Sequence, residues 1–208
     1  MGSAIILECR DIAFERDDEP LFEGVSFSVS PGDILQVTGA NGSGKTTLMR
    51  LLATVLTASA GDIHWRGKSV SRRLPAYRAD MLYLGHQPGI KSGLTPRENL
   101  QWLVSLSGAA TGIDAALAEV GLADYADVPC HTLSAGQLRR VALARLLTGG
   151  ASLWLLDEPL TAIDRDGIDT VQTLMARHVA GGGAIVVTTH QDLALTGVRR
   201  LEMARYAA

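Results

Sequence analysis

The chain has 208 residues, 47% of them hydrophobic, which is enough for a folded unit with a substantial buried core. Its net charge of −3 and sequence pI near 5.9 give no electrostatic reason to expect nucleic acid as a partner. Arginines occur in scattered pairs that we expect to be solvent-exposed, namely Arg72-Arg73, Arg139-Arg140 and Arg199-Arg200. Cys9 and Cys130 lie far apart without metal-ligand spacing, which favours reduced thiols in a cytoplasmic protein.

Neither a signal peptide nor a membrane span is expected. The apolar run at 4–7 is followed at once by Glu8 and Arg10, so it lacks the pattern of a leader. The most apolar region, 141–156, is interrupted by Arg145 and by two glycines, and falls short of the roughly 20 apolar residues that a bilayer requires. Work at a membrane would therefore depend on surface contact or on a partner.

The first third of the chain has a strand-rich pattern. Residues 5–14 and 25–29 are predicted strands separated by the charged turn 16–20, and 61–65 is predicted to form another. A short apolar strand at 34–37 then leads into a glycine-rich loop and a helical pattern. These segments predict an antiparallel layer beside a nucleotide-binding core.

The glycine-rich loop has the composition and context of a phosphate-binding loop. Its glycines let backbone N–H groups converge on one anion at a helix N-terminus. We expect Lys45 to reach the β and γ phosphates and the Thr46 hydroxyl to ligate Mg²⁺. A glycine-rich surface turn is the alternative interpretation. The residues predicted to bind nucleotide are Gly39, Ala40, Asn41, Gly42, Ser43, Gly44, Lys45, Thr46 and Thr47.

The middle of the chain, about 88–150, is predicted to be an almost wholly helical subdomain. A strand at 81–84 ends just before Gln87, and Thr95 with Glu98 forms a capping box for the next helix. A further helix is expected at 113–120. Residues 133–137 then open a helix through 147, again with capping-box spacing.

The last third alternates strands with helices, which predicts a mainly parallel sheet and an α/β fold. Residues 153–156 and 184–187 are apolar runs typical of parallel strands, 164–179 is helical, and 193–206 is expected to be a short helix and an edge strand. Asp157, at the end of the first run, is placed to hold Mg²⁺ opposite Thr46. Glu158 beside it could polarise an attacking water. A polar turn is the alternative for this pair when it is considered without the phosphate loop.

The motifs together resemble the nucleotide-binding subunits of ABC transporters. The order of the phosphate loop, Gln87, the LSAGQ run at 133–137, the LLDEP run at 155–159, the loop around Asp164 and His190 is that of the family. The resemblance implies ATP and Mg²⁺ as cofactors, an ABC ATPase fold over 1–208 and catalysis by Glu158, His190 and Lys45. It also implies that Thr46, Gln87 and Asp157 lie at the metal, and that Gln87 couples to the membrane partner.

The resemblance further implies a head-to-tail homodimer. Ser134, Gly136 and Gln137 of one copy would contact the γ-phosphate held by the other copy's loop, and the physics of a helix N-terminus points the same way. The sequence departs from the family in two places. Ala135 replaces a more common glycine, and Arg16 stands where the family usually stacks an aromatic ring on adenine. Arg16 could stack by its guanidinium plane, so selection of ATP over GTP is left open.

Within the family, the resemblance is narrower to the ATP-binding subunits of the cytochrome c maturation system. It lies in residues 85–91, 94–95 with 98–100, 158–164 and 189–191. It implies energy coupling for a membrane complex, through haem export or release of a haem chaperone, with integral membrane permease subunits as partners. The expected location is the cytoplasmic face of the bacterial inner membrane. The alternatives are an exporter of a lipid, peptide or drug, a soluble ABC ATPase that acts on ribosomes or DNA, and a phosphate-loop GTPase.

Overall fold

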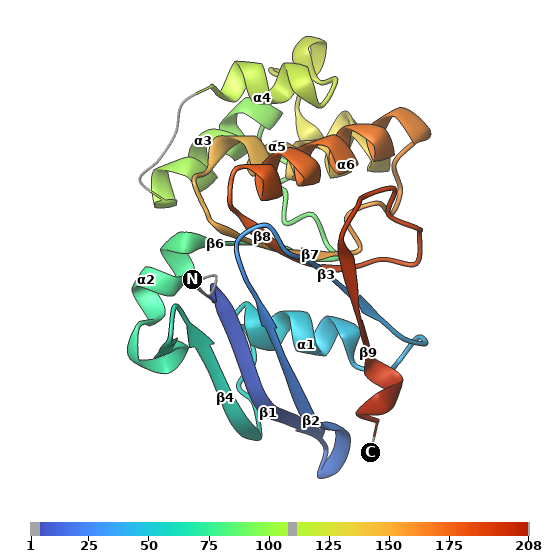
Figure 1. The fold of residues 1–208 in the computed structure, drawn as a ribbon. Coiled ribbons are helices and arrows are strands. Elements are labelled where there is room, and N and C mark those ends of the chain that lie inside the picture. The colour runs from blue at the N-terminus through green and yellow to red at the C-terminus, as the bar shows by residue number, and fades with distance from the viewer. Residues whose placement is uncertain (1–4, 108–111, 208) are drawn as a thin grey trace.

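The computed structural model describes residues 5–107 and 112–207, which fold around two sheets. The first sheet is antiparallel in the order β2-β1-β4-β5, and the second is parallel in the order β6-β7-β8-β3-β9. Helix α1 lies between the two sheets, and α3 to α6 cover the opposite face of the parallel sheet (Figure 1). The predicted α/β fold with an N-terminal antiparallel layer is confirmed.

The antiparallel sheet comes from the first third of the chain. Its strands alternate buried and exposed positions, as in a sheet with one face on the core. Phe22 is fully buried in the core beneath this sheet, with Leu48 and Met49 of α1. The strands are β1 (Leu7–Arg16), β2 (Glu19–Val29), β4 (Ala60–Trp65) and β5 (Lys68–Ser69), and α1 spans Lys45–Leu52.

The parallel sheet positions the functional residues. Its central strands β7 and β8 are buried at every position, because α1 covers one face and helices cover the other. The strand that enters the phosphate loop, β3, lies between β8 and β9. The sheet consists of β3 (Ile34–Thr38), β6 (Met81–Leu84), β7 (Leu153–Asp157), β8 (Ala184–Thr188) and β9 (Val198–Glu202).

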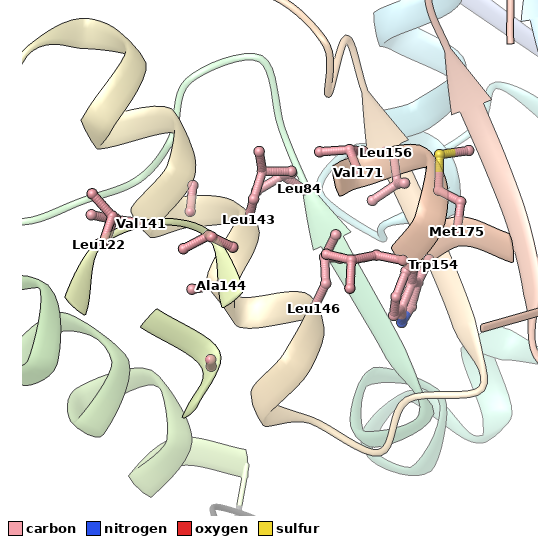
Figure 2. Packing of buried hydrophobic residues seen from close by; sticks show 14 of the residues in the cluster. Leu84, Leu122, Val141, Leu143, Ala144, Leu146, Trp154, Leu156, Val171 and Met175 are labelled. Carbon is pink, nitrogen blue, oxygen red and sulfur yellow. The ribbon is translucent and has the colours of Figure 1, made fainter. Parts of the chain in front are cut away.

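Helices from the middle of the chain pack with α6 over this sheet in one hydrophobic cluster (Figure 2). Trp154 of β7 lies in it beside Met175 of α6 and Leu146 of α5. The helices are α2 (Leu74–Asp80), α3 (Pro96–Ser107), α4 (Ile113–Glu119), α5 (Ala135–Thr148) and α6 (Arg165–Ala180), with short 3₁₀ turns at Val70–Arg72, Ala123–Tyr125, Cys130–Thr132 and Met203–Arg205. The boundary of the helical subdomain at about 88–150 stays a prediction.

Two local predictions need correction. A short helix followed by an edge strand was expected in 193–206, but the edge strand β9 comes first and a 3₁₀ turn follows. Residues 198–202 are extended because they pair with β3. Helix α2 was not predicted from the sequence, and it begins with Pro75 in its first turn, where the ring costs no hydrogen bond. Cys9 and Cys130 are both free and buried. Among the described residues, no helix has both the length and the apolar character needed to cross a bilayer.

Candidate functional site: a phosphate loop facing two carboxylates

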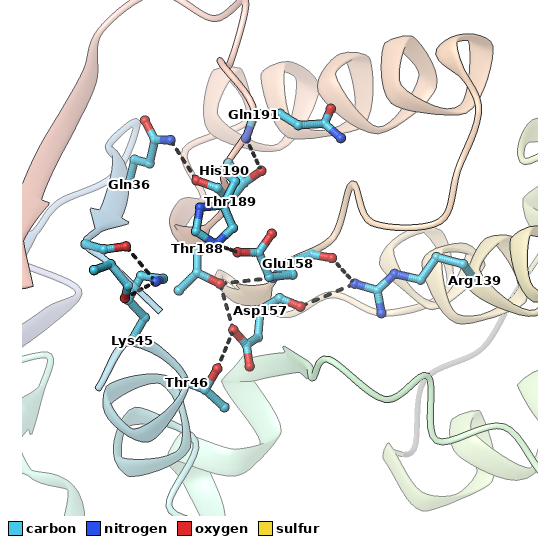
Figure 3. Close-up of polar contacts among 12 residues, drawn as sticks. Gln36, Lys45, Thr46, Arg139, Asp157, Glu158, Thr188, Thr189, His190 and Gln191 are labelled. Carbon is cyan, nitrogen blue, oxygen red and sulfur yellow. Dashed lines mark hydrogen bonds and ion pairs between the residues drawn. The ribbon is translucent and has the colours of Figure 1, made fainter. Parts of the chain in front are cut away.

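The phosphate loop connects β3 to α1, and its backbone requires glycine. Gly39, Gly42 and Gly44 have φ values of +154°, +85° and +89°, a region that side-chain-bearing residues rarely adopt. A Cβ at Gly44 would also lie 2.6 Å from the Phe22 ring. The Lys45 ammonium folds back over the loop and donates to the carbonyls of Gly39 at 2.7 Å and Ala40 at 2.9 Å (Figure 3). A cation therefore stands where phosphate oxygens would enter the loop.

Asp157 joins three elements at the base of the site. It is fully buried at the end of β7, and its Oδ1 accepts from the hydroxyl of Thr188 at 2.7 Å and that of Thr46 at 3.3 Å (Figure 3). The second carboxylate oxygen, Oδ2, is buried without a hydrogen-bond partner. A buried carboxylate oxygen beside a threonine hydroxyl is a suitable donor pair for Mg²⁺, so the residues fit the expected metal.

Glu158 is held in an unusual backbone conformation. Its φ is +52°, which is rare for a residue other than glycine and is found where the surroundings enforce it. Its N–H donates to both the carbonyl and the hydroxyl of Thr188, each at 3.0 Å. The Oε1 atom of Glu158 lies 3.6 Å from Nε2 of His190, whose side chain is 60% exposed. The Glu158 Oε1 is buried without a hydrogen-bond partner among the described residues, so the exposed His190 covers an unsatisfied carboxylate oxygen at which an attacking water could be held.

A cleft of about 450 Å³ lies between the phosphate loop and the Glu158–His190 pair, and Asp157 does not line it. Arg16 lines it, and Lys45, Thr46, Glu158 and His190 line it too. The expected contact of Arg16 with a nucleobase stays a prediction. Gln87 is solvent-exposed and does not line the cleft, whereas its neighbour His86 does. The proposed metal role of Gln87 therefore stays a prediction. The full lining is Arg16, Leu21, Asn41, Gly42, Gly44, Lys45, Thr46, Thr47, Arg50, His86, Glu158, Thr161 and His190.

The LSAGQ residues form a separate face. Ser134 caps α5 in a complete capping box, its hydroxyl accepting from the N–H of Gln137 while the Gln137 side chain accepts from the N–H of Ser134. A second cleft of about 480 Å³ lies over this helix start and shares no lining residue with the first. Arg140 pairs there with Asp164 at 2.5 Å and holds the pKa of that carboxyl below its usual range. Ser134, Gly136 and Gln137 are therefore together, but away from the phosphate loop of their own chain.

Arg139 corrects the prediction that the arginine pairs are solvent-exposed. Its exposed fraction is 3%, and the guanidinium donates only to backbone carbonyls in the described part of the chain. Burial lowers the pKa of Arg139, while the nearby Asp157 and Glu158 charges counteract that effect. The sequence held a usable signal, because Arg139, Ala142, Leu143 and Leu146 follow helical spacing and all four are buried.

Other residues were missed because their roles depend on tertiary neighbours. Thr188 ends a run that the sequence identified only as a strand, yet its hydroxyl bridges the two carboxylate residues. Gln36, buried in β3, donates to the Thr189 carbonyl at 3.3 Å and so anchors the segment that carries His190. The Gln191 side chain donates to the Leu160 carbonyl at 3.4 Å and ties the same segment to the loop after Glu158. A polar residue inside an apolar strand was the available signal for Gln36.

This fold and this site define an ATPase subunit of the ABC type. The chain belongs to the ABC transporter family, whose model matches residues 22–161. It is 50% identical over 190 residues to the cytochrome c biogenesis ATP-binding export protein CcmA of Yersinia pestis, covering 90% of this chain and 87% of that protein. The CcmA protein of Salmonella typhi is 49% identical over 200 residues, covering 95% and 97%.

Solved structures have the same fold. A Pyrococcus furiosus protein described as an ABC transporter ATP-binding protein superposes with a TM-score of 0.84 at 25% identity, covering 97% of this chain and 99% of that one. The ATP-binding cassette MJ0796, solved as a dimer in a post-hydrolysis state with ADP and Pi, superposes with a TM-score of 0.79 at 22% identity, covering 89% and 88%. At that identity the second likeness concerns the fold alone.

Proposed function

We propose that this chain is the ATP-hydrolysing subunit that drives a membrane complex in c-type cytochrome biogenesis, through haem export or release of a haem chaperone. The observation that carries the proposal is the site itself, in which a phosphate loop faces a buried carboxylate and a Glu158–His190 pair. The relatives at 49–50% identity are named for this process and support the choice of pathway.

The chemical roles follow from the donor set. The loop amides and Lys45 bind the phosphates, and Thr46 with Asp157 holds Mg²⁺, which offsets the charge that develops on the transferred phosphoryl group. Glu158 polarises the attacking water and His190 orients it against the γ-phosphate. Gln87, which is exposed and outside the cleft lining, would contribute to the metal site from the loop after β6.

A head-to-tail homodimer would complete each site. The N-terminus of α5 offers free backbone N–H groups and a partial positive charge, which suit a γ-phosphate. Its cleft shares no residue with the phosphate-loop cleft of the same chain, so a second copy is the natural source of that phosphate. We expect Glu158→Gln to stop turnover while leaving an ATP-bound dimer that gel filtration detects. Unchanged turnover would disprove the role of Glu158 as the base.

The pathway is tested in cells. Lys45→Ala removes the ammonium that faces the phosphates, so mature c-type cytochromes should disappear while Lys91→Ala, far from the loop, should leave them. Normal cytochrome levels in the Lys45→Ala strain would reject the pathway and leave the ATPase intact. Purification from detergent-solubilised inner membranes, with haem absorbance, separates this function from export of a lipid, peptide or drug. The expected partner is a permease that holds the chain at the cytoplasmic face.

Nucleotide selection is tested separately. Arg16 lines the cleft beside Leu21, and its guanidinium plane would stack equally on adenine or guanine. We expect GTP to compete with ATP within about tenfold in a binding assay, because one stacked face discriminates by little more than about 1 kcal/mol. Absence of competition at a hundredfold excess of GTP would place base selection elsewhere. Binding of GTP without any binding of ATP would favour the GTPase alternative.

A further inference from the structure

The buried guanidinium of Arg139 connects two loops of the nucleotide site. Its Nη2 donates to the Glu158 carbonyl at 2.6 Å (Figure 3). Its Nη1 donates to the Gly85 carbonyl at 3.0 Å. Three longer bonds, of 3.3 to 3.4 Å, reach the carbonyls of Asp157, Pro159 and His86. One side chain thus holds the backbone on both sides of Glu158 and the segment that leads to Gln87.

The chemistry of these contacts is that of a backbone clamp. Arg139 has an exposed fraction of 3%, and no carboxylate pairs with it within 5–107 and 112–207, so carbonyl dipoles are its compensation. A planar guanidinium has five donors in a fixed fork, which lets one residue bridge two separate loops. A lysine at this position would present three donors on a single nitrogen and would lack the planar fork that reaches several carbonyls at once.

The clamp acts at a residue whose backbone has a positive φ. Glu158 has φ of +52°, and such a conformation persists only when its neighbours over-determine it. Thr188 holds the N–H of Glu158 from one side, and Arg139 holds its carbonyl from the other. The direction in which the carboxylate leaves the main chain is therefore fixed by these two residues.

We propose that Arg139 is a positioning residue for hydrolysis, which aims the Glu158 carboxylate and links it to the LSAGQ helix. This proposal rests on the proposed function, in which Glu158 is the base. Arg139 lies two residues beyond Gln137, one turn into the helix whose start would meet the γ-phosphate of a second copy. When two copies come together, movement of α5 is transmitted through the guanidinium to Glu158 and to the segment before Gln87.

The test compares Arg139→Lys and Arg139→Gln with Arg145→Gln, a partly buried arginine further along α5 that donates to neither loop. In ATPase assays of the 208-residue chain, both Arg139 variants should lose kcat by about 10- to 100-fold, as expected for a misplaced catalytic group. The KM and Kd for ATP should change less than about twofold, because the phosphate contacts remain. Arg145→Gln should leave kcat, KM and Kd unchanged.

A double-mutant cycle with Glu158→Gln distinguishes positioning from general damage. If Arg139 works through Glu158, adding Arg139→Gln to Glu158→Gln should lower the single-turnover rate by less than about twofold further. The same 10- to 100-fold loss in that background, or a kcat within twofold of wild type in both Arg139 variants, would overturn the proposal. Arg139→Lys keeps the charge and serves as the decisive variant if Arg139→Gln does not fold. Full turnover by Glu158→Gln alone would instead refute the proposed base.

Discussion

The Thr188 hydroxyl offers a direct measure of how the site contributes to folding. Thr188→Val keeps the shape of the side chain and removes only its hydrogen-bonding group. The hydroxyl donates at 2.7 Å to a carboxylate that is fully buried, so its loss leaves the Asp157 charge with the 3.3 Å contact to Thr46 as its remaining side-chain donor. The second bond of the hydroxyl is partly redundant, because the N–H of Glu158 also donates to the Thr188 carbonyl.

The expected cost follows from these contacts. A hydrogen bond to a charged group contributes about 1.5–3 kcal/mol, and the redundant bond adds little, so we expect Thr188→Val to lower the free energy of unfolding by about 2–3 kcal/mol. For a chain of this size each kcal/mol shifts the melting midpoint by about 2–4 °C, which predicts a decrease of about 4–12 °C. Thr188→Ser keeps the hydroxyl and removes one methyl group, so it should cost only about 1 kcal/mol.

Urea unfolding followed by circular dichroism, with a parallel thermal scan, measures both variants against wild type. The free energy of unfolding should decrease in the order wild type, Thr188→Ser, Thr188→Val. If Thr188→Val were within about 0.5 kcal/mol of wild type while Thr188→Ser lost more, packing of the methyl would outweigh the hydroxyl. The hydrogen bond between Thr188 and Asp157 would then contribute nothing to stability, and the argument from burial would fail.

Two further predictions concern other parts of the fold. Gly44→Ala should destabilise the chain by about 1–3 kcal/mol more than Gly42→Ala in urea, since both positions have positive φ but only Gly44 lies against the Phe22 ring; equal losses would refute the clash. His178 stacks on Trp154 with ring centroids 3.8 Å apart, and burial lowers its pKa from the usual value near 6.5. The unfolded chain therefore binds more protons below that pH, and wild type should lose stability as the pH falls through about 6.5, whereas His178→Phe should lose less over the same range. Parallel urea midpoints for both proteins would contradict this.

The sequence was most informative about features that are determined by interactions within one short segment. The glycines of 39–44, the Thr95–Glu98 capping box and the capping box at Ser134 were all predicted, and the last two are observed as hydrogen bonds. The order of strands and helices also predicted the parallel sheet, because short, continuously apolar segments are typical of parallel strands that are covered on both faces. These features depend on residues within a few positions of one another.

The sequence was least informative where a role depends on distant neighbours. Arg139 was assigned to the surface because its partners are carbonyls 18 to 54 residues away, which leave no trace in composition. Gln87 is exposed, and its expected place at the metal stays a prediction, since a loop position does not determine where a side chain points. Strand β9 was placed after a helix because its pairing with β3 comes from residues 34–38.

The position of β3 in the parallel sheet bears on how the protein is made. Both of its sheet neighbours, β8 and β9, are translated about 150 residues later, and Met203, which follows β9, packs beside Gly39. Both sheet neighbours of β3 are therefore absent until late in translation, and we expect β3 and the loop that follows it to reach their final arrangement only once the late strands have paired with β3. Slow translation would lengthen the period in which this apolar strand is unpaired.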